Sequence, residues 1–127
     1  MKYSNFQGEW TMIRYFTIML TIFVLPNVSN AADGKGIRFW NLTADTITSL
    51  QLSPAGKDAW GPDQCQNDKD GSVDHDERLK IAHVEPGLYD AKFRDSKREC
   101  VVKNIEIKAG GIFSIEEKTL DGLCRPL

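Results

Sequence analysis

The chain has 127 residues and a formal net charge of −2, and 27% of its residues are charged. This length suits one domain beside an export signal. The basic residues are scattered and form no visible basic face, which argues against a nucleic-acid-binding protein.

The N-terminal region has the composition of a secretory signal peptide. Residues 15–25 carry no charge and follow Arg14, and Pro26 ends the run. Ser29 and Ala31 then supply the small residues of a cleavage site. A membrane span needs about 20 apolar residues, and this run has about half that number. We therefore predict a signal peptide over residues 1–31 and no stable membrane anchor after cleavage.

The remaining chain, residues 32–127, is predicted to be a single β domain in the periplasm or outside the cell. Met12 is an alternative start of the chain. Such a compartment permits disulfides, and Cys65, Cys100 and Cys124 allow three pairings. Cys65–Cys100 is favoured, because it would tie the acidic loop to a core strand while the C-terminal end frays. No spacing typical of zinc ligands supports a Cys/His zinc site.

Short apolar runs of the β type alternate with turn signals in this region. The Glu85-Pro86-Gly87 sequence is typical of a type II turn, and a meander of hairpins is expected over residues 79–117. The pattern predicts an all-β fold, a small antiparallel sandwich or barrel of about six strands with one long acidic loop. The expected strands are residues 37–42, 47–52, 79–84, 88–94, 99–107 and 112–117.

The acidic loop, QNDKDGSVDHDE at residues 66–77, resembles the calcium loop of an EF-hand. Gly71 falls at the sixth position, where the turn is sharp, and Val73 at the apolar eighth position. The first position, usually Asp, is Gln66, and no helix is expected on either side. This spacing predicts a calcium site whose ligands are Gln66, Asp68, Asp70, Ser72, Asp74 and Glu77. The alternative is a solvated polar loop without a metal ion.

Tryptophans mark two further candidate positions. Trp60 lies in a loop rich in Gly and Pro, where it either contacts a partner or caps the core. Phe39 and Trp40 are neighbours on a predicted strand, so they should point to opposite faces.

The segments LSPAGKDAWGPD, DERLKI, EPGLYDAKF and CVVKNIEI resemble a group of small, uncharacterised exported bacterial proteins, of the kind found in alphaproteobacteria. The WGPD and PG-YD segments carry this resemblance, which covers most of residues 36–120. It implies export and an all-β fold, and it brings no catalytic residues.

The sequence thus predicts a non-enzymatic periplasmic or secreted β domain whose acidic loop is stabilised by calcium. One alternative is a metal-free adhesion or partner-binding module that uses Trp60 and the sheet edges, with a protein or glycan as partner. Another is a small hydrolase that uses His75, but no nucleophile is positioned for it in the sequence.

Overall fold

The computed structural model describes residues 36–127, so the predicted signal peptide and its cleavage site lie outside the described residues. Within 36–127, no helix is long and apolar enough to cross a membrane. Two short 3₁₀ helices, η1 (Gln64–Asn67) and η2 (Glu117–Thr119), accompany the strands. The seven strands are β1 (Arg38–Leu42), β2 (Ser49–Pro54), β3 (Arg78–Lys80), β4 (Gly87–Arg94), β5 (Arg98–Ile107), β6 (Ile112–Glu116) and β7 (Cys124–Pro126).

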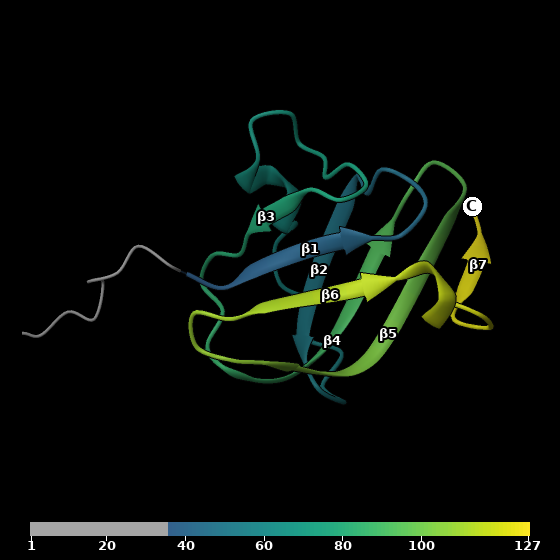
Figure 1. The fold of residues 1–127 in the computed structure, drawn as a ribbon. Coiled ribbons are helices and arrows are strands. Elements are labelled where there is room, and N and C mark those ends of the chain that lie inside the picture. The colour runs from purple at the N-terminus through teal and green to yellow at the C-terminus, as the bar shows by residue number, and fades with distance from the viewer. Residues whose placement is uncertain (1–35) are drawn as a thin grey trace, which may run out of the picture. The chain divides into compact units, whose positions relative to one another are not determined.

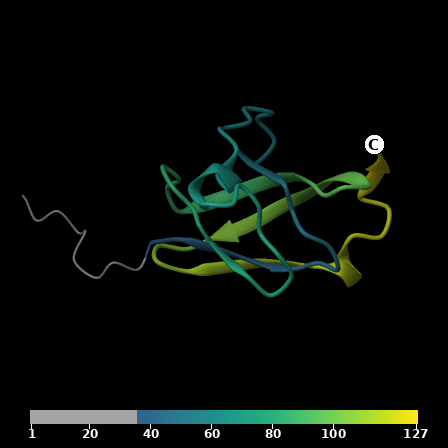
Figure 2. The same cartoon turned by 90° about the horizontal axis from the view of Figure 1, so that it is seen from above.

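The strands form two sheets, one in the order β3-β1-β6 and the other in the order β2-β4-β5-β7 (Figure 1). Seen from above, the sheets lie over one another as two layers (Figure 2). The predicted all-β, sandwich-like fold is confirmed.

Two details of the predicted topology are wrong. β1 and β6 are parallel, so the sandwich is not wholly antiparallel. The expected meander also breaks up, because β3 pairs with β1 while β4 pairs with β2 and β5. β3 ends earlier than predicted. The Ala82 N–H donates to the Gln64 side chain, and His83, which lies within the predicted strand 79–84, is exposed with a φ of 59°.

The core lies between the two sheets and follows the alternation of each strand. Phe39 from β1 and Phe113 from β6 face inward with ring centroids 5.3 Å apart, and Leu50 and Phe93 come from the opposite sheet. Each fully buried side chain of this size contributes about 1.5–3 kcal/mol through the hydrophobic effect. The inward positions therefore specify the register of both sheets.

A bulge interrupts the pairing of β4 with β5. Lys103 and Asn104 lie opposite the single residue Asp90, and Asn104 has a φ of 57°. The buried Asp90 carboxylate accepts hydrogen bonds from the Asn104 N–H at 3.0 Å, the Gly56 N–H at 3.0 Å and Lys103 Nζ at 3.2 Å. One carboxylate therefore joins the bulge to the turn that follows β2.

The disulfide joins Cys100 to Cys124, so the favoured Cys65–Cys100 pairing is wrong. These two cysteines are directly paired residues of β5 and β7, and their Cα atoms are 4.0 Å apart. The three-residue β7, which no strand pattern predicted, holds the C-terminal end in place. Cys65 is a free, buried thiol, and burial together with the nearby Asp63 raises its pKa to about 12. A thiol with such a pKa is not reactive near neutral pH.

Candidate functional site

The first half of the acidic loop, the teal segment beside β3 in Figure 1, begins in a 3₁₀ turn. Gln66 lies within η1, and its Nε2 is 3.5 Å from Asp63 Oδ2. The Asp68 carboxylate accepts a 2.8 Å hydrogen bond from the Asp70 N–H. Asp70 is exposed and Ser72 is half-buried. These side chains shape the local turn.

The second half of the loop is fastened to the turn between β1 and β2. Asp74 Oδ1 accepts a 2.8 Å bond from Thr46 Oγ1. Glu77, expected to reach back to the ion, instead accepts a 2.8 Å bond from the Asp74 N–H. His75 Nδ1 lies 2.6 Å from the Thr43 carbonyl oxygen. The polar side chains in this half of the loop therefore form hydrogen bonds within the protein.

Two features of a calcium loop are nevertheless present. Gly71 has a φ of 71°, as the sharp turn at the sixth position requires. Val73 is fully buried and forms an antiparallel bridge with Ile47, through hydrogen bonds of 2.9 and 2.8 Å. The apolar residue at the eighth position therefore attaches the loop to the body of the domain.

The predicted ligands do not converge in this conformation. Within residues 36–127, no three His, Cys, Asp or Glu side chains are grouped so that they could hold a metal ion. A hard cation needs six to eight oxygens around one point, and Asp68, Asp74 and Glu77 are turned toward hydrogen-bond donors. Calcium binding stays a prediction that requires the loop to rearrange.

A buried polar network, which the sequence analysis did not single out, holds this end of the domain together. Asn41 is fully buried, and its Nδ2 donates to the carbonyl oxygens of Asp45 and Val73 at 3.0 and 2.9 Å. Its Oδ1 accepts from the Thr43 N–H at 2.9 Å and the Thr43 hydroxyl at 2.7 Å. Asn41-Leu42-Thr43 has the pattern of an N-glycosylation site, but the Asn41 amide is buried and hydrogen-bonded in this network, which leaves no room for a glycan on the folded domain.

The WGPD segment, residues 60–63, covers the outer edge of β2. The Gly61 N–H donates to the Leu52 carbonyl at 2.9 Å, and Asp63 Oδ1 accepts from the Leu50 N–H at 2.9 Å. Trp60 is half-buried, with Lys92 Nζ 4.5 Å from its ring centroid. Covered edges resist unwanted strand pairing, so the geometry favours a structural role for Trp60.

A second tryptophan marks the outer face of the β3-β1-β6 sheet. Strand register places Arg38 beside Lys80 and Ile112, and Trp40 beside Arg78 and Ser114. All six side chains are half-buried or exposed, whereas the intervening Phe39, Leu79 and Phe113 are buried. We call this surface the Trp40 face; it consists of Arg38, Trp40, Arg78, Lys80, Ile112 and Ser114.

The centre of the Trp40 face is fixed by two contacts. The Arg78 guanidinium carbon lies 4.4 Å from the Trp40 ring centroid, a cation–π geometry. The indole N–H donates to Asp76 Oδ1 at 2.9 Å. Arg78 is therefore stacked and oriented, and its in-plane N–H groups can donate to an oxyanion.

The cations of this face also lack carboxylate partners. Within the described part of the chain, no ion pair involves Arg38, Arg78 or Lys80. Six other basic residues do form ion pairs there, namely Arg94, Lys97, Arg98, Lys103, Lys118 and Arg125. The sequence did not reveal the cluster, because its members come from strands that are distant in the chain.

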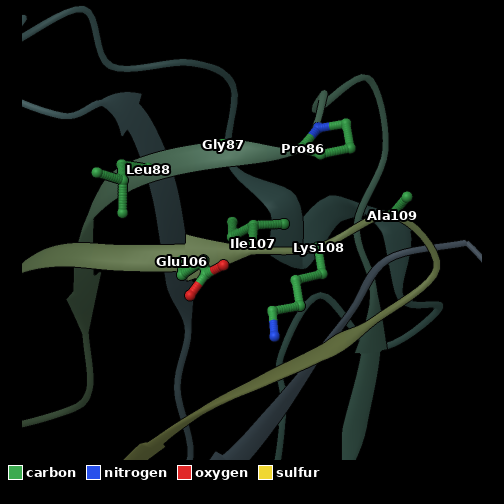
Figure 3. Close-up of a pocket in the computed structure, with 7 residues that line it drawn as sticks. All are labelled: Pro86, Gly87, Leu88, Glu106, Ile107, Lys108 and Ala109. Carbon is green, nitrogen blue, oxygen red and sulfur yellow. The ribbon is translucent and has the colours of Figure 1, made fainter.

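A shallow depression of about 590 Å³ lies at the open end of the β4–β5 hairpin, where β4 begins and β5 ends (Figure 3). Leu88 beside it is 55% exposed. Its only ionisable lining groups are Glu106 and Lys108, so it offers little specific chemistry. The depression is lined by Pro86, Gly87, Leu88, Glu106, Ile107, Lys108 and Ala109.

No known family model, curated protein or solved structure matches this chain. The resemblance to small exported bacterial proteins therefore stays a prediction.

Proposed function

We propose that this chain is a non-enzymatic β domain, exported to the periplasm or secreted, that binds a polyanionic partner through the Trp40 face. The disulfide supports an oxidising compartment. The histidines support a non-catalytic role, since His75 contacts a backbone carbonyl and His83 is exposed.

One observation carries the proposal: the three cations of the Trp40 face, which form no ion pair with any described residue, share one sheet face with a tryptophan held by a cation–π contact and a hydrogen bond. Exposed charges of one sign attract ligands of the opposite sign and speed their association. Arg78 needs little further ordering when it binds, because Trp40 already holds its guanidinium in place. The surface is therefore preorganised for anionic groups.

The test compares Arg78→Ala with Lys92→Ala in the full chain. Both variants remove one positive charge that stacks on a tryptophan, but on opposite sheets. Four immobilised probes are used: heparin, single-stranded polythymidylate, vesicles containing phosphatidylglycerol, and polyaspartate. We expect at least one probe to bind the wild type and Lys92→Ala equally, and Arg78→Ala about tenfold more weakly. Equal affinities of both variants for every probe would reject the Trp40 face.

We also propose, as a separate property, that the acidic loop binds calcium weakly. The Gly71 turn and the Val73–Ile47 bridge support this proposal. Binding must displace the Asp74 N–H from Glu77, which lowers the affinity. At a calcium concentration tenfold above Kd, folding stability should rise by about 1.4 kcal/mol.

Calorimetric titration of calcium into the chelator-treated chain measures this effect, with magnesium as the control. We expect the heat and the rise in Tm to disappear in Asp70→Ala and Glu77→Ala. Absence of both signals in the wild type at several millimolar calcium would establish the loop as a metal-free connector.

A further inference from the structure

We infer that the ligand of the Trp40 face is an acidic polysaccharide, recognised through its carboxylate or sulfate groups. This inference rests on the proposed function and narrows the partner to one chemical class.

The arrangement of the three cations fits a chain of anionic groups better than a single ion. Arg38 and Lys80 are directly opposite residues of β1 and β3, and Arg78 lies two positions from Lys80 along β3. Directly opposite side chains in a sheet are about 5 Å apart at Cβ. Residues two positions apart along a strand are separated by about 6–7 Å, so Arg78 is offset from the Arg38–Lys80 pair along the strand direction. The three donors therefore lie along an exposed sheet face, where a polymer can meet them with successive groups.

Single-stranded nucleic acid fits this surface less well, because its non-specific recognition depends on bases stacking on open aromatic rings. One face of the Trp40 ring is covered by Arg78, and its N–H is bonded to Asp76. The tryptophan thus serves to position the arginine. The groups left for a ligand are cationic N–H donors and the Ser114 hydroxyl, which match oxyanions and sugar hydroxyls.

A bilayer and an acidic peptide are also disfavoured. Ile112, which is 51% exposed, is the one aliphatic side chain of the Trp40 face, and three cations alone attract an anionic bilayer weakly. Extended peptides usually add to a sheet edge. The cations lie on the face of the sheet, and the Lys80 carbonyl at the β3 edge already accepts a bond from Asn67 at 3.0 Å.

Asp76 provides a test of whether the ligand is negatively charged. Its carboxylate holds the Trp40 N–H beside the cations, so it should repel an anionic ligand. Asp76 has a φ of 69°, which asparagine tolerates, and an asparagine oxygen can accept the same bond. Asp76→Asn should therefore keep Trp40 in place and remove one negative charge. We expect polysaccharide affinity to rise about twofold to threefold.

The decisive experiment measures binding of the full chain to immobilised heparin and polygalacturonate, with polythymidylate, phosphatidylglycerol vesicles and polyaspartate as comparison probes. We expect at least one polysaccharide to bind more tightly than all three comparison probes, and to bind Arg78→Ala about tenfold more weakly than Lys92→Ala. Arg78→Lys should fall in between, since lysine keeps the charge but not the planar N–H pair. Circular dichroism confirms that each variant is folded.

The outcomes distinguish failure of the polysaccharide as ligand from failure of the Trp40 face as a binding site. Arg78-dependent binding that is tightest for polythymidylate, the vesicles or polyaspartate would overturn the polysaccharide and leave the proposed function standing. Weaker polysaccharide binding by Asp76→Asn would also overturn the polysaccharide as the ligand. Equal binding of Arg78→Ala and Lys92→Ala to every probe would overturn both, since only net charge would then matter.

Discussion

The outer faces of the two sheets differ in how their charged groups are paired. On the four-stranded sheet, Glu99 lies between Arg94 and Arg125 on the neighbouring strands, and Asp90 holds Lys103. On the three-stranded sheet, the cations of the Trp40 face have no such partners among the described residues. Charged side chains that pair with each other stabilise the fold, whereas side chains without an ion-pair partner remain available to a ligand.

Burial explains why the carboxylates on the outer face of the four-stranded sheet are paired with basic side chains. Asp90 and Glu99 are only 1% and 6% exposed. Hydrogen bonds from the Gly56 N–H to Asp90, and from Arg94 to Glu99, are the main causes that lower the pKa of each carboxyl. A buried carboxylate needs such partners, because its charged form is otherwise costly to remove from water. The cations of the Trp40 face are half-buried or exposed, so water can solvate them and they need no such partners.

The largest effect we expect is a loss of stability in acid. Burial acts to raise the pKa of Asp95, but hydrogen bonds from the Lys97 N–H and from Arg98 outweigh it and lower that pKa. A hydrogen bond from Arg98 also lowers the pKa of Glu117. A lowered folded-state pKa gives stability that is present above the ordinary carboxyl pKa and lost as the pH falls through the folded value. Because four acids act together, Tm should fall steadily as the pH is lowered from about 5, above the ordinary carboxyl pKa values, toward about 2.

Thermal melts across that pH range test the comparison directly. A variant with Arg38, Arg78 and Lys80 all changed to alanine should show the same pH profile as the wild type. A flattened profile in this variant would mean that the Trp40 face also stabilises the native carboxylates.

Asp90→Ala should have the next largest effect. It leaves the Gly56 and Asn104 N–H groups without their acceptor and Lys103 without its partner, which should cost about 2–3 kcal/mol in urea unfolding. Asp121→Ala, which removes an exposed carboxylate, should stay within about 0.5 kcal/mol. A loss below about 1 kcal/mol for Asp90→Ala would show that the bulge is held by backbone pairing alone.

The smallest stability effects should come from the Trp40 face. Arg78→Ala loses a partly exposed cation–π contact and should cost about 0.5–1 kcal/mol, as should Lys92→Ala. Lys80→Ala should be nearly neutral. Urea unfolding of the three variants measures this. A cost above about 2 kcal/mol for Arg78→Ala would assign it a structural role.

The sequence predicted the fold where the signal was local. Alternating side chains located six of the seven strands, although β3 has only three residues and ends at Lys80 instead of at the predicted residue 84. Gly71 and the apolar Val73 marked the sharp turn and the buried position of the acidic loop. β7 was missed, because three residues ending in Pro126 carry no periodicity. The disulfide depended on β7 and was therefore misassigned.

The candidate site was beyond sequence reasoning for a different reason. Arg38 and Lys80 are separated by some forty residues and meet only through the β1–β3 register. Likewise, the spacing of the acidic loop can indicate calcium ligands, but whether oxygens converge depends on backbone angles that spacing does not determine. Contacts between distant segments defined the surface chemistry of this protein.

The burial of Cys65 has a consequence for how the molecule ages under oxidising conditions. Thiol–disulfide exchange needs a thiolate, and the raised pKa keeps Cys65 protonated inside the core. The Cys100–Cys124 bond is therefore protected from attack by the odd thiol within its own chain. Molecules with rearranged or intermolecular disulfides should form only when the domain transiently unfolds and exposes Cys65. The rate at which they form would therefore report how often the native state unfolds.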